Sequence, residues 1–151
     1  MIIGMFFHIL AAVIWVGGMF FAHQMLRPAA GPLAPAERLP LWRRVFERFF
    51  PVVWGAIVAL LASGYAMVFR GFGGFANLPL YVDLMQGIGI IMMMIFAHLC
   101  FAPWKRFRRA LDGGDLPAAQ RQLDQIRRIV GVNLVLGLVI VVIGATGPFW
   151  E

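Results

Sequence analysis

Four long stretches of the chain contain no charged side chain. Asp, Glu, Lys and Arg are absent from residues 2–26, 49–69, 84–104 and 129–150, which are dominated by aliphatic and aromatic residues. At 1.5 Å per residue, each stretch as a helix is long enough to cross a hydrocarbon core about 30 Å thick. The pattern therefore predicts an all-α fold, an integral membrane four-helix bundle forming one transmembrane domain over residues 1–151, with spans at about 2–26, 49–69, 84–104 and 129–149.

The polar segments between these stretches differ in charge. Five of the cations lie in 27–48 and seven in 105–128, whereas the connection 71–83 follows a single arginine, Arg70, at its edge. Cationic loops remain on the cytoplasmic side of a membrane, so both termini are expected outside, an N-out and C-out arrangement. The first stretch lacks a positive n-region and exceeds a signal-peptide h-region, which favours a transmembrane helix.

Composition excludes a soluble protein with a single core. The chain is 62% hydrophobic and only 13% charged, against roughly half and a quarter in globular domains. Its net charge of +6 does not indicate a nucleic-acid partner, because the basic residues flank the apolar stretches instead of forming a face. The lone cysteine, Cys100, excludes an intrachain disulfide.

Turn-forming residues predict where the helices begin and end. Several prolines and glycines between 27 and 35 predict an irregular first connection, after which Pro40 can open the helix that enters the second span. The sequence Asp112-Gly113-Gly114 ends the third helix, and Asp115 can cap the fourth.

The three histidines of the chain all lie inside the apolar stretches, where a polar side chain is costly and marks a candidate functional site. At 100° per residue, His8, Trp15, Met19 and His23 share one stripe of the first helix. We expect this stripe and two further stripes, on the third and fourth helices, to face the interior of the bundle. They are the third-helix stripe through Asp83, Gly87, Ile91, Met94, His98 and Ala102, and the fourth-helix stripe through Asn133, Gly137, Ile140, Gly144 and Gly147.

Depth in the membrane favours His23 and His98 as a pair. Both fall in the cytoplasmic leaflet, about 9 Å apart along the normal, whereas His8 and His98 differ by about 14 Å. Two imidazoles can hold the iron of one haem, with Trp15, Met94 and Asn133 lining the cofactor, and Arg27 and Arg43 could meet its propionates. Haem b is therefore the preferred cofactor, with His8 as an alternative ligand or second site.

Copper is the alternative at His8. Thioether and imidazole ligands suit Cu(I), and the methionines Met1, Met5 and Met85, together with Gln86 and Asp83, are candidate neighbours in the outer leaflet. A third interpretation is that the histidines only form hydrogen bonds between helices. The sequence leaves these alternatives open.

The run from His8 through Trp15 to Gly17-Gly18 resembles the first-helix signature of the CopD family of bacterial inner-membrane proteins, named for copper resistance. Arg48-Phe-Phe-Pro51 through Ser63-Gly64 is similar to the second helix of that family, and Ile126-Arg127-Arg128 through Asn133 to its fourth. The resemblance implies a multi-pass protein of the bacterial inner membrane with a role in copper handling or membrane electron transfer.

A looser resemblance links the chain to HemJ-type protoporphyrinogen oxidases, four-helix membrane proteins associated with haem b. His8, seven residues before Trp15, and His98, late in the third helix, match its pattern. His23-Gln24 stands where that family has an arginine, and Leu134 follows Asn133 where a glutamate is expected. The resemblance implies an alternative function as a haem-biosynthetic oxidoreductase. Expected partners are the lipid bilayer and, for electron transfer, a redox protein or quinone; homo-oligomerisation stays open.

Overall fold

The computed structural model describes residues 2–76 and 78–150, and helices account for almost all of them. The prediction of an all-α fold is confirmed: four of the helical stretches are long and apolar enough to cross a membrane, and no strand occurs among the described residues. In chain order the elements are α1 (Ile2–Phe20), the π-helix η1 (Phe21–Leu26), α2 (Arg27–Ala30), α3 (Pro35–Gly71), α4 (Leu80–Phe101), α5 (Pro103–Asp112), α6 (Leu116–Thr146) and the 3-10 turn η2 (Gly147–Phe149).

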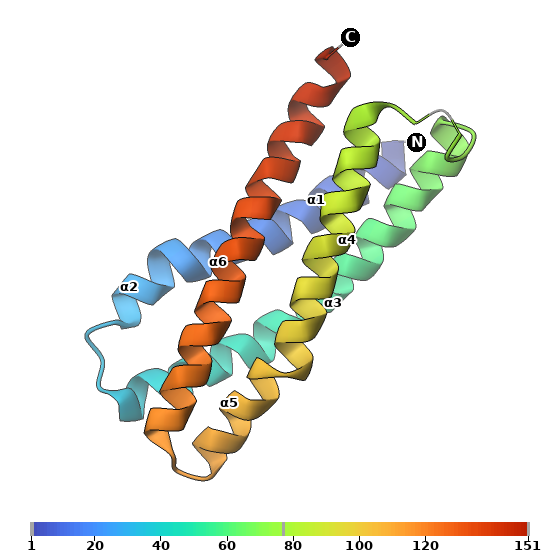
Figure 1. Cartoon of the computed structure of the whole chain (residues 1–151). Coiled ribbons are helices and arrows are strands. Elements are labelled where there is room, and N and C mark those ends of the chain that lie inside the picture. Colours follow the sequence, from blue (N-terminus) through green and yellow to red (C-terminus); the bar gives the residue numbers. More distant parts are fainter. Residues whose placement is uncertain (1, 77, 151) are drawn as a thin grey trace.

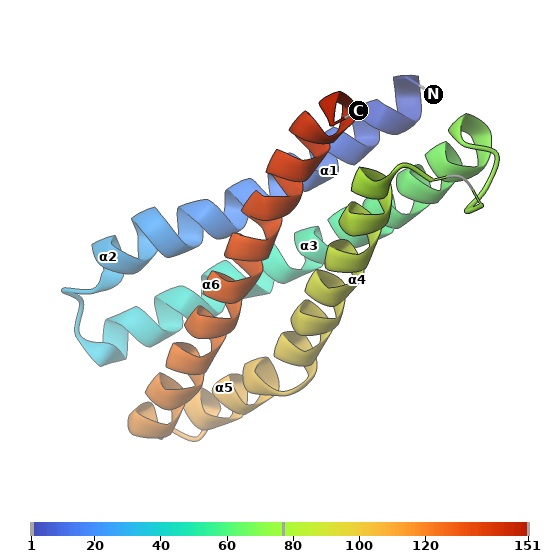
Figure 2. The ribbon, with the colours of Figure 1, turned by 45° about the horizontal axis from the view of Figure 1, so that its top comes forward.

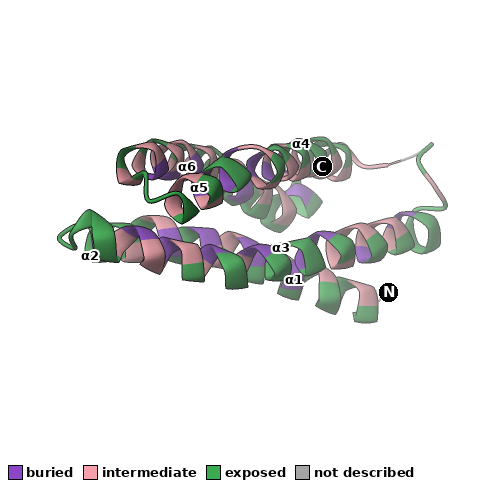
Figure 3. Cartoon of the chain, turned by 90° about the horizontal axis from the view of Figure 1, so that it is seen from below, coloured by how far each residue is buried: buried purple, intermediate pink, exposed green. Residues whose placement is uncertain are grey.

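The helices form two layers. α1 packs along α3 in one layer, and α4 and α5 pack along α6 in the other, as Figure 3 shows from below. α6 also contacts α1 and α3, so it joins the layers. Both termini lie at the same end of the bundle, together with the connection between α3 and α4 (Figures 1 and 2). This arrangement agrees with an even number of membrane crossings.

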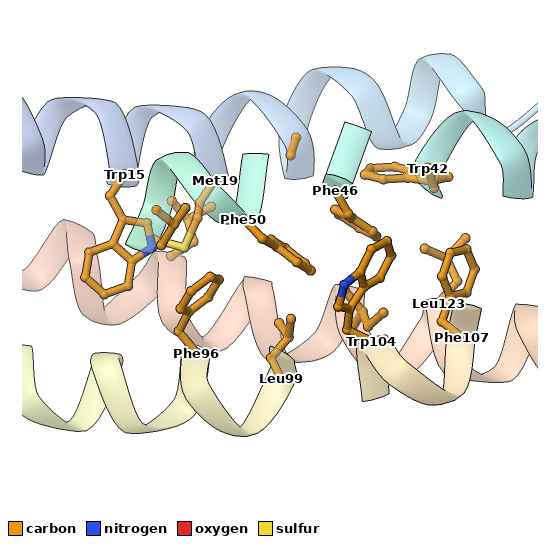
Figure 4. Close-up of a cluster of buried hydrophobic side chains, with 14 of the residues drawn as sticks. Trp15, Met19, Trp42, Phe46, Phe50, Phe96, Leu99, Trp104, Phe107 and Leu123 are labelled. Carbon is orange, nitrogen blue, oxygen red and sulfur yellow. The ribbon is translucent and has the colours of Figure 1, made fainter. Parts of the chain in front are cut away.

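The tightly packed core lies between the layers. Figure 4 shows its large side chains in a row from Trp15 to Phe107. Phe50 packs edge-on against Phe96 and Trp104, with ring centroids 5.5 and 5.2 Å apart. Such edge-to-face pairs add specific attraction to the burial of apolar area. Aromatic packing therefore fixes how the two layers meet in the half of the bundle that carries the cationic loops.

The ends of the helices differ from the sequence prediction in three places. The second long helix begins at Pro35 and contains Pro40 in its interior, so the prediction that Pro40 opens it is wrong. The first helix continues past Arg27-Pro28 to Ala30, because a π-turn precedes the proline: the N–H of Arg27 bonds to the carbonyl of Ala22, five residues back. A wider turn before Pro28 lets the chain remain helical although proline cannot donate a hydrogen bond.

The third difference is a break inside the third long helix. α4 ends at Phe101, the backbone bends at Ala102, and α5 starts with Pro103. Proline is favoured in a first helical turn and disfavoured in a helix interior. The bend turns Trp104 and Phe107 into the core, where both are buried. The predicted stop at Gly113-Gly114 and the cap at Asp115 are confirmed, since Asp115 Oδ1 accepts a hydrogen bond of 2.9 Å from Ala118 N–H.

Candidate functional site

His8 lies half-buried on α1 against the facing surface of α3. Its Nδ1 is 3.0 Å from Ser63 Oγ. The Ser63 hydroxyl also contacts the backbone carbonyls of Ala59 and Leu60, which can only accept hydrogen bonds. The single hydroxyl hydrogen is therefore donated to the backbone, and Ser63 Oγ accepts from His8 Nδ1–H.

We assign to His8 the tautomer with hydrogen on Nδ1, because the Ser63 hydroxyl hydrogen is directed to the backbone carbonyls. With hydrogen on Nδ1, the neutral ring keeps an unprotonated Nε2, which is the form that binds a metal ion. A histidine that ligates a metal usually donates its other N–H to an acceptor of the protein, as His8 does to Ser63. Gly64 makes the close approach of the helices possible, because a Cβ there would lie 3.3 Å from His8 Cε1.

Met67 lies one turn further along the same face of α3. A Cβ on Gly4, one turn before His8 on α1, would lie 3.3 Å from Met67 Cγ. Gly4 and His8 thus face Ser63 and Met67 across the α1–α3 contact, and an imidazole and a thioether occupy neighbouring turns of it. Sequence reasoning missed Met67; the signal was its spacing of four residues from Ser63, which places both on one helix face.

The methionines that the sequence proposed beside His8 lie elsewhere. Met5 is 48% exposed. Met85 packs against α6, where a Cβ on Gly144 would lie 3.1 Å from its Cε. Asp83 is exposed and Gln86 half-buried, both on α4, which packs mainly on α6 and α5. Met1 lies outside the described residues.

His23 occupies a different environment, in the π-turn η1. Its ring packs on α6 so closely that a Cβ on Gly131 would lie 3.1 Å from His23 Cε1. Arg27 is exposed on the next turn. Arg43 forms ion pairs with Glu47, at 2.9 Å, and with Asp112, so two carboxylates already neutralise it.

His98 is exposed on the outer surface of α4. Most of its stripe is exposed as well, including Asp83, Gly87, Ile91 and Met94, the last at 63%. The prediction that this stripe faces the interior is therefore wrong. The reason is that Met92, Phe96 and Leu99 supply the larger apolar surface and turn the opposite face of α4 inward.

The other two stripes do face the interior. Trp15 and Met19 are buried on α1, and Asn133 and Gly137 are buried on α6. Asn133 donates a hydrogen bond of 3.2 Å to the backbone carbonyl of Met92, which ties α6 to α4. This contact gives Asn133 a role in joining helices.

These positions do not suit a haem held by two histidines. His23 faces α6 from η1, whereas His98 lies on the outside of α4. Among the residues that the structure describes, no three His, Cys, Asp or Glu side chains gather to hold a metal ion. The imidazole of His8 and the thioether of Met67 lie on neighbouring turns of the α1–α3 contact. These two donor types suit a soft ion such as Cu(I).

Comparison with known proteins gives one match. The model of the family described as copper resistance protein D, CopD, matches residues 43–146, which include α4, α5, α6 and most of α3. No curated protein and no solved structure matches the chain. Since the family model spans well over half of its length, the chain belongs to the CopD family, as a membrane protein of the copper-resistance type.

Proposed function

We propose that this protein handles copper by binding Cu(I) between α1 and α3, with His8 Nε2 and the Met67 thioether as ligands. The observation that supports the proposal is the distance of 3.0 Å between His8 Nδ1 and Ser63 Oγ, which favours the tautomer with an unprotonated Nε2. Membership of the CopD family supplies the link to copper. Copper is the cargo of the protein in this proposal.

The site lies toward the end of the bundle that holds both termini (Figure 1). If the cationic loops are cytoplasmic, as the charge distribution predicts, this end faces outward, into the periplasm of a Gram-negative cell. A site with two soft ligands in the outer leaflet suits capture of Cu(I) from that side. A bacterial inner membrane is the location that the family resemblance implies.

Titration of the purified protein with Cu(I) against a coloured Cu(I) chelator tests the proposal. The wild type should remove one copper ion from the chelator. His8→Ala should abolish this competition, and Met67→Leu, which keeps the volume of the side chain, should weaken binding by about tenfold or more because one of two ligands is lost.

Two exposed residues of α4 provide matched controls. Met94→Leu and His98→Ala remove the same chemical groups from the outer surface of the bundle, and copper binding should not change. Equal losses in the controls and in His8→Ala would overturn the proposal, and so would full binding by His8→Ala.

The absorption spectrum of the same purified protein tests the alternative that the protein binds haem. Because His23 and His98 do not face one another, we expect no Soret band in the absorption spectrum. A Soret band that disappears in His98→Ala would restore the haem interpretation and with it the HemJ-type alternative. Complementation of a strain that lacks protoporphyrinogen oxidase would then decide whether the protein is that enzyme.

A further inference from the structure

A second site lies at the opposite end of the bundle, where α1 continues through η1 into α2. A small pocket there is lined by side chains from η1, α2, α3 and α6: Ala22, His23, Arg27, Trp42, Phe46, Arg127 and Val130. Its polar groups, the indole, the imidazole and the two guanidinium groups, are hydrogen-bond donors or cations, and no carboxylate lines it.

Two of these donors are buried without a partner. Trp42 is 2% exposed and its Nε1–H makes no hydrogen bond. The Nε–H group of Arg127 is also buried and makes no hydrogen bond. The Arg127 guanidinium lies 5.1 Å from the centre of the Trp42 ring, so the two unpartnered groups belong to one contact. An unpaired buried donor costs about 1–3 kcal/mol. Both residues line the pocket, so an acceptor that reaches these donors from it would remove that cost.

The local charge favours an anion as the acceptor. The positive charges of Arg27 and Arg38 act on Arg127, and those of Arg27 and Arg127 act on His23. The carboxylate that contacts Arg127 is Asp124, at 3.5 Å and half-exposed, and it also accepts a hydrogen bond from Gln120. Because this one long ion pair is set against three arginines, Arg27, Arg38 and Arg127, positive charge is in excess around the pocket.

The small size of the pocket and the apolar surface of its helices indicate what kind of anion it can bind. The cavity encloses about 10 Å³, enough for one water-sized group, and the rest of a ligand must lie outside it. The helices that form it, η1 and α6, also carry exposed apolar side chains at Phe21, Met25 and Val132, along which lipid chains would lie. Basic pockets between transmembrane helices near the membrane surface bind the head groups of anionic lipids.

We propose that this pocket, which we name the Arg27–Arg127 pocket, binds the phosphate group of an anionic phospholipid. One phosphate oxygen accepts from Trp42 Nε1–H and Arg127, and Arg27 approaches from the surface. The acyl chains lie along the exposed apolar faces of η1 and α6. The proposal concerns the end of the bundle away from His8 and does not depend on copper binding.

The retention of lipid by the purified protein tests whether the Arg27–Arg127 pocket binds an anionic phospholipid. The full-length protein is reconstituted in nanodiscs with equal amounts of phosphatidylglycerol and phosphatidylcholine, extracted in mild detergent, and examined by native mass spectrometry. We expect one retained phosphatidylglycerol on the wild type. Arg127→Gln and Arg27→Gln should each lower retention by about fivefold, the effect of one cation at the membrane surface. Trp42→Phe keeps an aromatic side chain, although a smaller one, removes the N–H and should also lower retention.

Arg109→Gln and Arg121→Gln serve as matched controls, because both remove an exposed cation from the same end of the molecule. Neither should change retention. Arg27 is exposed, so its substitution leaves the core intact even if Arg127→Gln fails to fold.

Three results would overturn the proposal. Equal loss in the controls would show general attraction of anionic lipid to the cationic end. Equal retention of phosphatidylcholine would show an unspecific lipid shell. Release of the lipid by millimolar inorganic phosphate would show a site for free phosphate.

Discussion

In the copper site that we propose, Ser63 acts on metal binding through His8. Its hydroxyl accepts from His8 Nδ1–H and thereby keeps Nε2 free. Ser63→Ala removes the acceptor, so the imidazole can adopt the other tautomer and rotate. Loss of such a supporting hydrogen bond typically costs ten- to a hundredfold in metal affinity. We expect a fall of about tenfold or more in Cu(I) affinity, measured by chelator competition.

Ser63→Thr is the control for this prediction, because it retains a hydroxyl that can accept from His8. Its Cu(I) affinity should stay within a few-fold of the wild type. If Ser63→Ala binds copper as tightly as the wild type, the hydrogen bond has no role in the site.

At the residue scale, the sequence pattern predicted candidate side chains, but it did not predict which of them lie close together. The histidines were found because polar groups are rare in apolar spans. Their partners depend on how each helix is rotated about its axis, which the sequence pattern determines poorly when residues all around the helix are apolar. Met67 was missed for the same reason, since methionines are also common as packing residues.

At the scale of whole helices, the contact between α1 and α6 depends on Gly137. A Cβ at this buried position would lie 2.9 Å from Val16 Cγ2 and 3.2 Å from Met92 Cε. Gly137→Ala should therefore destabilise the bundle, since overpacking a close contact costs about 1–3 kcal/mol. The free energy of unfolding in mixed micelles, obtained by titration with dodecyl sulfate, measures this change.

Gly55→Ala, in contrast to Gly137→Ala, should not destabilise the bundle. Gly55 is exposed on α3 and a Cβ there would meet no atom within 4 Å. Alanine is favoured over glycine in a helix interior by about 0.5–1 kcal/mol, so this variant should be as stable as the wild type or more stable. Equal destabilisation by both substitutions would show that the contact at Gly137 is not tight.

The helices themselves could be predicted from the sequence, but their interruptions could not. Absence of charge over about twenty residues is sufficient for a membrane-spanning helix. The bend at Ala102 accompanies the burial of Trp104 and Phe107, and the π-turn before Pro28 accompanies the packing of His23 on α6 at Gly131. Both involve contacts between segments distant in the sequence. The prediction that the α4 stripe faces the interior was wrong because periodicity shows which residues share a face, but not which face is buried.

At the scale of the whole molecule, orientation in the membrane follows from the distribution of arginine and lysine. We expect the connection at Ala76 outside and the start of α3, at Ala36, in the cytoplasm. In a Cys100→Ala background, a membrane-impermeant maleimide added to cells with a permeabilised outer membrane should label Ala76→Cys. It should label Ala36→Cys only after lysis. Both positions are exposed, so the reverse pattern would place the cationic end outside.

The central claim is that the molecule binds Cu(I) at the α1–α3 contact near the termini. X-ray absorption of the copper-loaded protein tests this most directly, because imidazole nitrogen and thioether sulfur scatter differently. We predict both scatterers in the wild type, with the sulfur contribution lost in Met67→Leu and retained in Met94→Leu. A spectrum without sulfur, or one whose sulfur contribution survives in Met67→Leu, would contradict the account.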